Sequence, residues 1–214
     1  MMKLKTLERF VNLLRDSIQS LFLYHQNMEL MKLLLYNLIK FIYDSGGKNM
    51  AKKDKAKDIK TNAVRIVESA GIEYKLYTYD APDGFLDGVS VALQTGQDLD
   101  RVFKTLVVVG HSKEHYVCVI PVAEELDFKK AAKYFGEKNI EMIHARDITK
   151  VTGYIKGGCS PVGMKKQFKT AIHETGEILD TICVSGGKVG LQMELNPMDL
   201  AVLIDAGYAD LTKE

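Results

Sequence analysis

The chain has 214 residues, of which 46% are hydrophobic and 27% charged, an ordinary composition for a globular protein with a substantial core. Residues 1–49 hold seven Lys or Arg and four Asp or Glu, which leaves 22 basic and 24 acidic residues in the rest; this near balance excludes the domain-wide basic field of many nucleic-acid binders. The three cysteines form no CxxC pair and the five histidines are scattered, so neither a disulfide framework nor a metal site is indicated and a reducing cytosol is expected.

The amino-terminal segment, residues 1–49, differs in composition from the rest. Its first 44 residues lack Gly, Ala and Pro, and apolar residues recur at helical spacing from Leu7 to Phe22. Charged residues interrupt it too often for a secretory signal or a membrane span. It is either a pair of amphipathic helices that dock on the body or on a partner, or translated upstream sequence. The second reading rests on Gly46–Met50, which back-translates to a ribosome-binding purine run before a start codon. We therefore divide the chain into 1–49 and a domain at 50–214.

The first elements of the domain follow from periodicity. Residues 61–70 have helical spacing and stop at a glycine, residues 73–79 alternate as a strand, residues 80–87 form a loop, and residues 89–95 form a short helix.

Residues 101–110 read RVFKTLVVVG, an apolar strand that contains one lysine, Lys104. Such a run predicts a strand buried on both faces. An ammonium there is costly to desolvate unless it faces a polar pocket or finds an acceptor. The alternative is a lysine at the strand end whose stem is buried and whose head lies in water.

The remaining elements alternate between strands and helices. Residues 116–121 form a hairpin partner for the lysine strand, and strands are expected at 167–173, 181–184 and 190–195. Helices are expected at 128–135 and 147–151, and a last one opens with Asn196 as its cap and Pro197 in its first turn. Because hairpins join several strands, a mixed sheet is favoured over a purely parallel one.

Two loops are unusually rich in glycine: residues 152–163, TGYIKGGCSPVG, and residues 184–190, VSGGKVG. Glycine pairs expose backbone N–H groups and let a ligand approach the main chain closely. Neither loop has the spacing of a Walker motif. Each could be a simple tight turn, but two in one small domain beside a lysine strand indicate a binding cleft.

No familiar hydrolytic machinery is present. The chain contains no GxSxG or HExxH motif and no carboxylate pair at catalytic spacing. Cys159 lies in the first glycine loop and His173 could serve as its base, but nothing in the sequence brings the two together. A structural or substrate-neighbouring thiol is the favoured interpretation of Cys159.

Three motifs together resemble the YbaK/EbsC family: FKTL around Lys104, TGYIKGGCSPVGMKK from residue 152, and VSGGKVGLQMEL from residue 184. The resemblance covers roughly residues 60–212. The family comprises free-standing aminoacyl-tRNA editing proteins related to the insertion domain of bacterial prolyl-tRNA synthetase. The retained GGxSPxGxKK pattern is closer to the Cys-tRNA(Pro) deacylases than to the alanine-specific relatives. The resemblance implies an α+β fold with a mixed, barrel-like sheet flanked by helices.

The resemblance also implies a reaction, the clearance of cysteine from mischarged Cys-tRNA(Pro) in the cytoplasm. Cysteine and proline are too close in size for a synthetase pocket to separate by sterics alone, so a second site must reject the error. In this family the thiol of the substrate is thought to attack its own carbonyl, so that neither a protein nucleophile nor a cofactor is required.

The site residues are carried over position by position. Lys104 matches the family's required lysine, expected to bind the phosphate or ribose of the terminal adenosine. Tyr79 matches a pocket tyrosine, the pair Gly157 and Gly158 matches the glycines whose amides face the aminoacyl group, and the opposite wall is matched by Ser185 and Gly186. Gln192 stands where some relatives have aspartate, so its role is open.

The partners implied are Cys-tRNA(Pro) and prolyl-tRNA synthetase. The synthetase would supply much of the affinity for tRNA that a near-neutral domain lacks. No membrane partner is expected. Two alternatives stay open. The first is an Ala-tRNA(Pro) deacylase of the same fold, and the second is a non-catalytic module that binds tRNA or the synthetase.

Overall fold

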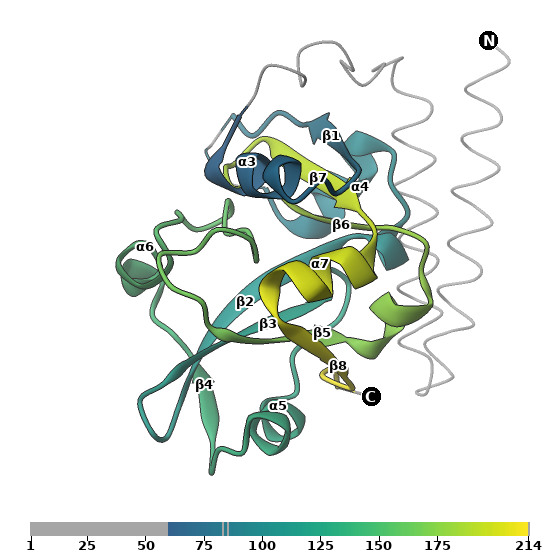
Figure 1. Ribbon diagram of the computed structural model, residues 1–214. Coiled ribbons are helices and arrows are strands. Elements are labelled where there is room, and N and C mark those ends of the chain that lie inside the picture. Colours follow the sequence, from purple (N-terminus) through teal and green to yellow (C-terminus); the bar gives the residue numbers. More distant parts are fainter. Residues whose placement is uncertain (1–59, 83, 85, 214) are drawn as a thin grey trace, which may run out of the picture. The chain divides into compact units, whose positions relative to one another are not determined.

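The computed structural model describes residues 60–82, 84 and 86–213, and five α-helices and two β-sheets are found there (Figure 1). The expected boundary after residue 49 and both interpretations of residues 1–49 lie outside the described residues. None of the helices in the described part of the chain combines the length and the apolar character that a membrane crossing requires.

The smaller sheet has three antiparallel strands in the order β1-β7-β6, seen in the upper half of Figure 1. Its strands are β1 (Tyr74–Thr78), β7 (Leu191–Leu195) and β6 (Ile182–Ser185). Side chains alternate between the two faces of a strand. One face carries Met193 and Val184, both buried in the main core against α3 (Asn62–Ser69). The other face carries Gln192 and the residues beside it, which is where a polar site can form.

The larger sheet has five strands in the order β4-β2-β3-β5-β8. The hairpin of β2 (Phe103–Gly110) and β3 (His115–Pro121) is antiparallel, whereas β5 (Lys169–His173) runs parallel to both β3 and β8 (Ala206–Ala209). At the other edge β4 (Ile140–Met142) pairs with only the last three residues of β2. The earlier part of β2 is therefore an open edge.

The helices begin where the sequence supplies capping side chains. Asp87 caps α4 (Gly88–Thr95), Asp127 caps α5 (Phe128–Phe135), and Asn196 caps α7 (Pro197–Ile204), the last as predicted. A short helix, α6 (Ile148–Thr152), precedes the first glycine loop.

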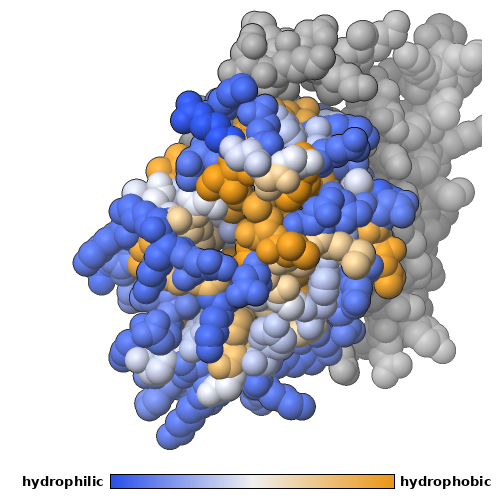
Figure 2. All heavy atoms as spheres, in the orientation of Figure 1, coloured by the Kyte–Doolittle hydropathy of each residue, from blue (hydrophilic) through white to orange (hydrophobic). Residues whose placement is uncertain are grey.

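Apolar side chains gather at the surface around α7, near the middle of the face shown in Figure 2. The buried side of α7 joins the main core through Leu200, Ala201 and Ile204. Its outer side leaves Met198 and Val202 exposed.

The predicted α+β class with a mixed sheet is confirmed. In the described residues the strands form two sheets rather than a closed barrel, and an isolated parallel bridge between Val102 and Cys183 links them. The expectation that the lysine strand is buried on both faces was wrong for its middle, because Lys104, Thr105 and Leu106 are only half-buried at the open edge. The strand that is buried along nearly its whole length is instead β3, whose residues 116–121 are all buried.

Candidate active site

Lys104 lies in β2 opposite Ile120 of β3, and its side chain is half-buried. Its ammonium donates a hydrogen bond to the carbonyl of Val122, 3.0 Å away, which occupies one of its three donors. Burial lowers the pKa of Lys104, while the nearby Glu125 and Glu124 act in the opposite direction. One N–H of the ammonium is thus bound by the protein itself, and its two other N–H groups can donate to a ligand.

A pocket of about 410 Å³ opens beside Lys104. Most of its lining is apolar, and the few polar groups in it come from elements far apart in the sequence. Such a combination is typical of small-molecule sites, where apolar walls bind and a few polar groups orient. Its lining comprises Tyr79, Leu86–Val89, Phe103–Val107, Val122, Met142, Ile148, Lys156, Gly157, Cys159 and Gln192.

The two glycine loops, residues 152–163 and 184–190, pack directly against each other. A methyl group on Gly158 of the first loop would come within 2.9 Å of the Cα atom of Lys188 and 2.8 Å of the amide nitrogen of Val189, both in the second loop. Contacts that short are not tolerated, so only glycine allows the two backbones to pack. The Gly158 amide donates to the Ile155 carbonyl at 3.0 Å, which leaves Gly157 as the member of the pair that lines the pocket.

The second loop is also tied to the start of α3. The hydroxyl of Thr61, the cap of α3, donates to the Gly186 carbonyl at 2.6 Å. The Gly186 amide donates to the Leu191 carbonyl at 3.0 Å, and a methyl group on Gly186 would collide with the Leu191 side chain. These contacts fix the β6–β7 turn in place.

Gln192 faces the pocket from β7 and is only 6% exposed. Its side-chain oxygen is buried and has no hydrogen-bond partner among the described residues. A buried acceptor without a donor costs free energy unless a ligand or water supplies one. The pocket therefore offers a ligand one acceptor, the Gln192 oxygen, and one cationic donor, the Lys104 ammonium.

Four of the predicted site residues line this one pocket, namely Lys104, Tyr79, Gly157 and Gln192. Burial raises the pKa of Tyr79, with a hydrogen bond from the Gly190 backbone acting in the opposite direction, so its phenol stays protonated at neutral pH. Ser185 lies directly opposite Gln192 in the β6–β7 pair, and Ser185, Gly186 and Gly158 lie outside the lining. Their direct role in substrate binding stays a prediction.

Cys159 also lines the pocket, whereas His173, the base considered for it, does not. The ring nitrogens of His173 lie 2.9 Å from the Thr175 hydroxyl and 3.1 Å from the Thr212 hydroxyl, around the end of β5. Burial raises the pKa of Cys159 to about 11, so the thiol is protonated at neutral pH. A protonated thiol is a poor nucleophile, and the favoured interpretation of Cys159 as a structural or substrate-neighbouring thiol stays a prediction.

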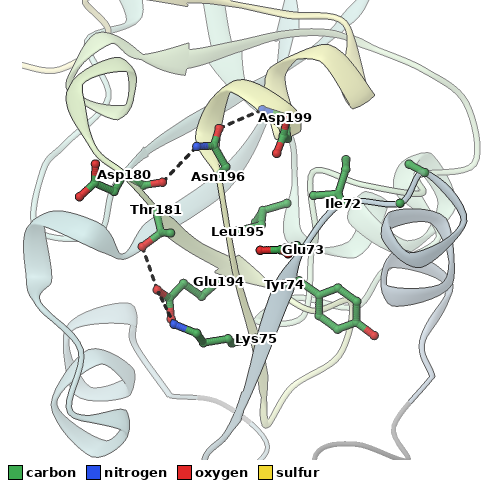
Figure 3. Close-up of a pocket in the computed structure, with 12 residues that line it drawn as sticks. Ile72, Glu73, Tyr74, Lys75, Asp180, Thr181, Glu194, Leu195, Asn196 and Asp199 are labelled. Carbon is green, nitrogen blue, oxygen red and sulfur yellow. Dashed lines mark hydrogen bonds and ion pairs between the residues drawn. The ribbon is translucent and has the colours of Figure 1, made fainter.

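A larger pocket of about 790 Å³ lies at the other end of the small sheet (Figure 3). Its polar side chains are bonded to one another: Glu194 accepts from Thr181 at 2.8 Å and lies 3.9 Å from Lys75, and Asn196 donates to the Asp180 carbonyl. None of the site residues predicted from the sequence lines it. Because Glu194 and Asn196 already have partners and no predicted site residue lines it, this pocket is the weaker candidate for a site.

Sequence reasoning did not find two parts of the pocket. The first is the start of α4, where Gly88 packs so closely on Val122 that an added methyl group would lie 2.5 Å from a Val122 methyl carbon. The one sequence signal for this contact is the Asp-Gly pair that precedes an apolar run. The second is Thr105, the other polar residue of the lysine strand, whose buried hydroxyl has no partner among the described residues.

Comparison with known proteins agrees with the geometry. Residues 89–203 match the family model of the aminoacyl-tRNA editing domain. The chain is 45% identical over 163 residues to the "Putative Cys-tRNA(Pro)/Cys-tRNA(Cys) deacylase EbsC" of Enterococcus faecalis (strain ATCC 700802 / V583), which covers 76% of this chain and 98% of that protein.

Solved structures share the fold. The crystal structure of "a putative trans-editing enzyme for prolyl tRNA synthetase" superposes with a TM-score of 0.63 at 22% identity and covers 73% of this chain and 99% of that one. A second, described as a hypothetical protein, gives a TM-score of 0.65 at 20% identity and covers 72% of this chain and 100% of that one. The chain therefore belongs to the aminoacyl-tRNA editing domain family, as its resemblance to YbaK/EbsC predicts, and with it to the aminoacyl-tRNA deacylases.

Proposed function

We propose that this protein is a trans-editing deacylase that removes cysteine from mischarged Cys-tRNA(Pro). The observation that carries the proposal is one apolar pocket that combines the Lys104 ammonium, the Gly157 backbone and the Gln192 oxygen, which has no hydrogen-bond partner within residues 60–82, 84 and 86–213. The match to a relative named for Cys-tRNA(Pro) and Cys-tRNA(Cys) supports the choice of amino acid.

The reaction proposed uses the thiol of the substrate itself. The cysteine sulfur attacks its own ester carbonyl, a C–S bond forms, the C–O bond to the ribose breaks, and the thiol proton ends on the ribose oxygen. Water then opens the cyclic thiolactone to free cysteine. The Cys159 thiol is protonated, and His173, whose ring nitrogens lie beside the Thr175 and Thr212 hydroxyls, does not line the pocket; both observations are consistent with this route.

The fold then has to hold the substrate in a folded conformation. Positioning of two groups within one molecule is a large part of the rate of such a cyclisation. Lys104 would hold the phosphate or ribose of the terminal nucleotide, and the Gln192 oxygen would accept from the α-ammonium group. The pocket wall formed by Gly157 would lie against the aminoacyl group, where a side chain would take up room.

Prolyl-tRNA synthetase is the proposed partner. A domain with 22 basic and 24 acidic residues lacks the charge that would hold a whole tRNA unaided. Joint action with a synthetase that binds the tRNA body would supply that affinity. Addition of the synthetase should lower the KM for Cys-tRNA(Pro), and an unchanged KM would count against the partnership.

The experiment is a deacylation assay with tRNA(Pro) charged with cysteine, alanine or 2-aminobutyrate. The last replaces the thiol of cysteine by a methyl group of similar size. Rapid release of cysteine alone supports thiol-assisted cyclisation. Release of all three indicates attack by water and the broader alanine-type activity, and binding without any release indicates a non-catalytic module.

Lys104→Ala should abolish the release of cysteine while the melting temperature stays close to that of the wild type. Lys138→Ala, at an exposed position away from the pocket, is the matched control and should keep full activity. Full activity of Lys104→Ala would count against the assignment of the site.

A further inference from the structure

The charges of the domain are unevenly spread, although they nearly balance. Residues 146–169 hold six Lys or Arg and one acidic residue, Asp147, whose carboxylate lies 3.9 Å from the Arg146 guanidinium. This stretch includes α6 and the first glycine loop, which supplies Lys156 and Gly157 to the lining of the candidate active site. An excess of positive charge therefore lies in the part of the chain that forms one wall of the pocket.

Three exposed lysines surround the first glycine loop in space. The Lys165 ammonium donates to the Lys150 carbonyl at 3.2 Å, and a methyl group on Gly153 would lie 3.2 Å from the Lys165 Cγ atom. Lys188 comes from the β6–β7 turn, and its Cα atom packs against Gly158. Together with the one lysine of the loop that lines the pocket, they form a group that we call the lysine rim: Lys150, Lys156, Lys165 and Lys188.

The lysine rim is poor in counter-ions. Within the described residues, none of Lys150, Lys165 and Lys188 forms an ion pair with a carboxylate. Like charges gathered around one loop repel one another and attract a polyanion, which gains further affinity from the counter-ions that it releases.

The other charged residues near Lys104 are acidic. Asp87 lines the pocket at the start of α4, and Glu125 and Glu124 lie close enough to Lys104 to act on its pKa. Carboxylates there disfavour further phosphates beyond the one that Lys104 can hold. A nucleic-acid strand with its end in the pocket is therefore disfavoured on the side of these carboxylates and favoured over the lysine rim.

We propose that the lysine rim binds the phosphates of the nucleotides directly before the terminal adenosine, so that the 3′ strand of the tRNA leaves the pocket over the first glycine loop. Lysines that contact phosphates add affinity without reading sequence. So few contacts do not hold a whole tRNA, which keeps a need for the synthetase. This inference rests on the proposed function, because it takes the aminoacyl end of a tRNA as the occupant of the pocket.

The test measures binding of a tRNA that cannot react, tRNA(Pro) whose terminal adenosine carries cysteine through a 3′-amide. It is titrated against the full-length protein between about 50 and about 200 mM salt. The variant is the triple change Lys150→Gln, Lys165→Gln and Lys188→Gln, which leaves the pocket lining intact. We expect its salt dependence to flatten by about two in log–log slope and its affinity at about 0.1 M salt to fall about 100-fold, the effect of three lost contacts to a single strand.

The matched control removes the same charge elsewhere. Lys129, Lys133 and Lys138 are exposed in and just after α5, which Figure 1 shows apart from α6. Their triple change to Gln should keep the wild-type slope and an affinity within about threefold of the wild type. An equal loss of affinity in the two triple variants would indicate a general field rather than a surface for the strand, and would overturn the proposal.

A second measurement locates the phosphates. The two linkages that precede the terminal adenosine are replaced by uncharged methylphosphonates. The wild type should lose affinity, and the rim variant should lose little more, because the same contacts are already absent. Losses that simply add would overturn the proposal. Unchanged tRNA binding together with weaker binding to prolyl-tRNA synthetase would assign the lysine rim to the protein partner and would also overturn it.

The outcomes are independent of the proposed function. Turnover of the ester substrate tests deacylation, whereas the amide titrations test the path of the strand. Deacylation without coupling between the lysine rim and the two linkages refutes this inference alone, and coupling without deacylation refutes the proposed function alone. If the rim variant does not fold, as shown by its melting curve, the single change Lys188→Gln is measured against the same two tRNAs and decides.

Discussion

At the scale of single residues, the half-buried side chain of Lys104 donates one hydrogen bond to the Val122 carbonyl and also lines the pocket. Burial lowers its pKa, so the ammonium loses its charge at a lower pH than an ordinary lysine. Where the charge holds an anionic nucleotide, affinity must fall as the lysine deprotonates. A pH dependence on the alkaline side therefore reports on this residue.

We predict that binding of the cysteinyl-amide tRNA weakens as pH rises from about 7 to about 10, the range below and around an ordinary lysine pKa. Lys104→Arg should bind more weakly at neutral pH but show little alkaline loss, because a guanidinium stays charged. Lys138→Arg, at an exposed position, should keep the wild-type profile. A wild-type profile in Lys104→Arg would rule out Lys104 as the titrating group.

Gln192 carries a stability cost that a binding role would explain. Its buried oxygen, which has no partner among the residues that the structure describes, opposes folding, whereas an apolar side chain of the same length would not. We predict that Gln192→Met raises the free energy of unfolding by about 1 kcal/mol and lowers kcat/KM at least about tenfold. Urea unfolding and the deacylation assay measure the two quantities. A destabilised variant with full activity would show that Gln192 serves the fold instead.

At the scale of elements, the site depends on how closely the two glycine loops approach. Gly158 has no positive φ angle, so its requirement for glycine is steric, and the atoms it would strike belong to the Lys188–Val189 backbone. We predict that Gly158→Ala separates the loops and lowers kcat/KM by about 100-fold, the effect of moving catalytic groups by about 1 Å.

The matched control is Gly71→Ala. Gly71 follows α3 with a φ of +71°, and no atom of the described part of the chain lies within 4 Å of its added methyl group, so this variant tests backbone strain without a collision. It should lose about 1 kcal/mol of stability and keep its activity. Equal activity in the two variants would mean that the contact between the loops does not shape the site.

The elements themselves were predicted well where the local signal is strong. The helix at residues 128–135 has the predicted bounds, because its Asp cap and its terminal glycine are both local features. The lysine hairpin also follows from its own residues. In contrast, β4 and β8 were not predicted, since three or four residues with mixed side chains form a strand only through the neighbours that they pair with.

At the scale of the whole molecule, His173 connects the large sheet to the chain end. Its Nδ1 accepts from the Thr175 amide, and its Nε2 lies 3.1 Å from the Thr212 hydroxyl and 3.8 Å from Asp210. Burial lowers the pKa of His173; Asp210, Glu174 and Glu124 act against this effect, and Lys130 reinforces it. The folded protein therefore prefers the neutral imidazole.

The sign of the pH effect follows. Below the unfolded pKa of the histidine, the unfolded chain takes up a proton that the folded chain resists, so stability falls as pH falls. We predict that the free energy of unfolding declines between about pH 7.5 and about pH 5.5, around an ordinary histidine pKa, and that His173→Gln reduces this decline. His144→Gln, at an exposed position, should leave the decline unchanged. An identical decline in His173→Gln would show that other groups cause it.

The sequence by itself determined the order of the main helices and strands, the family, and four of the residues that line the pocket, namely Lys104, Tyr79, Gly157 and Gln192. Helix caps, the alternation of apolar and polar residues, and glycine-rich motifs are each recognised within a few consecutive residues. Three such motifs in the right order identify a family without coordinates. Only the tertiary structure decided that β4 pairs with only the last three residues of β2, that Gly158 rather than Gly157 packs against the second loop, and that the ring of His173 lies beside Thr175 and Thr212. The β4 pairing, the Gly158 contact and the contact of His173 with Thr212 join residues far apart in the sequence, and such packing is set by the whole core rather than by any local pattern.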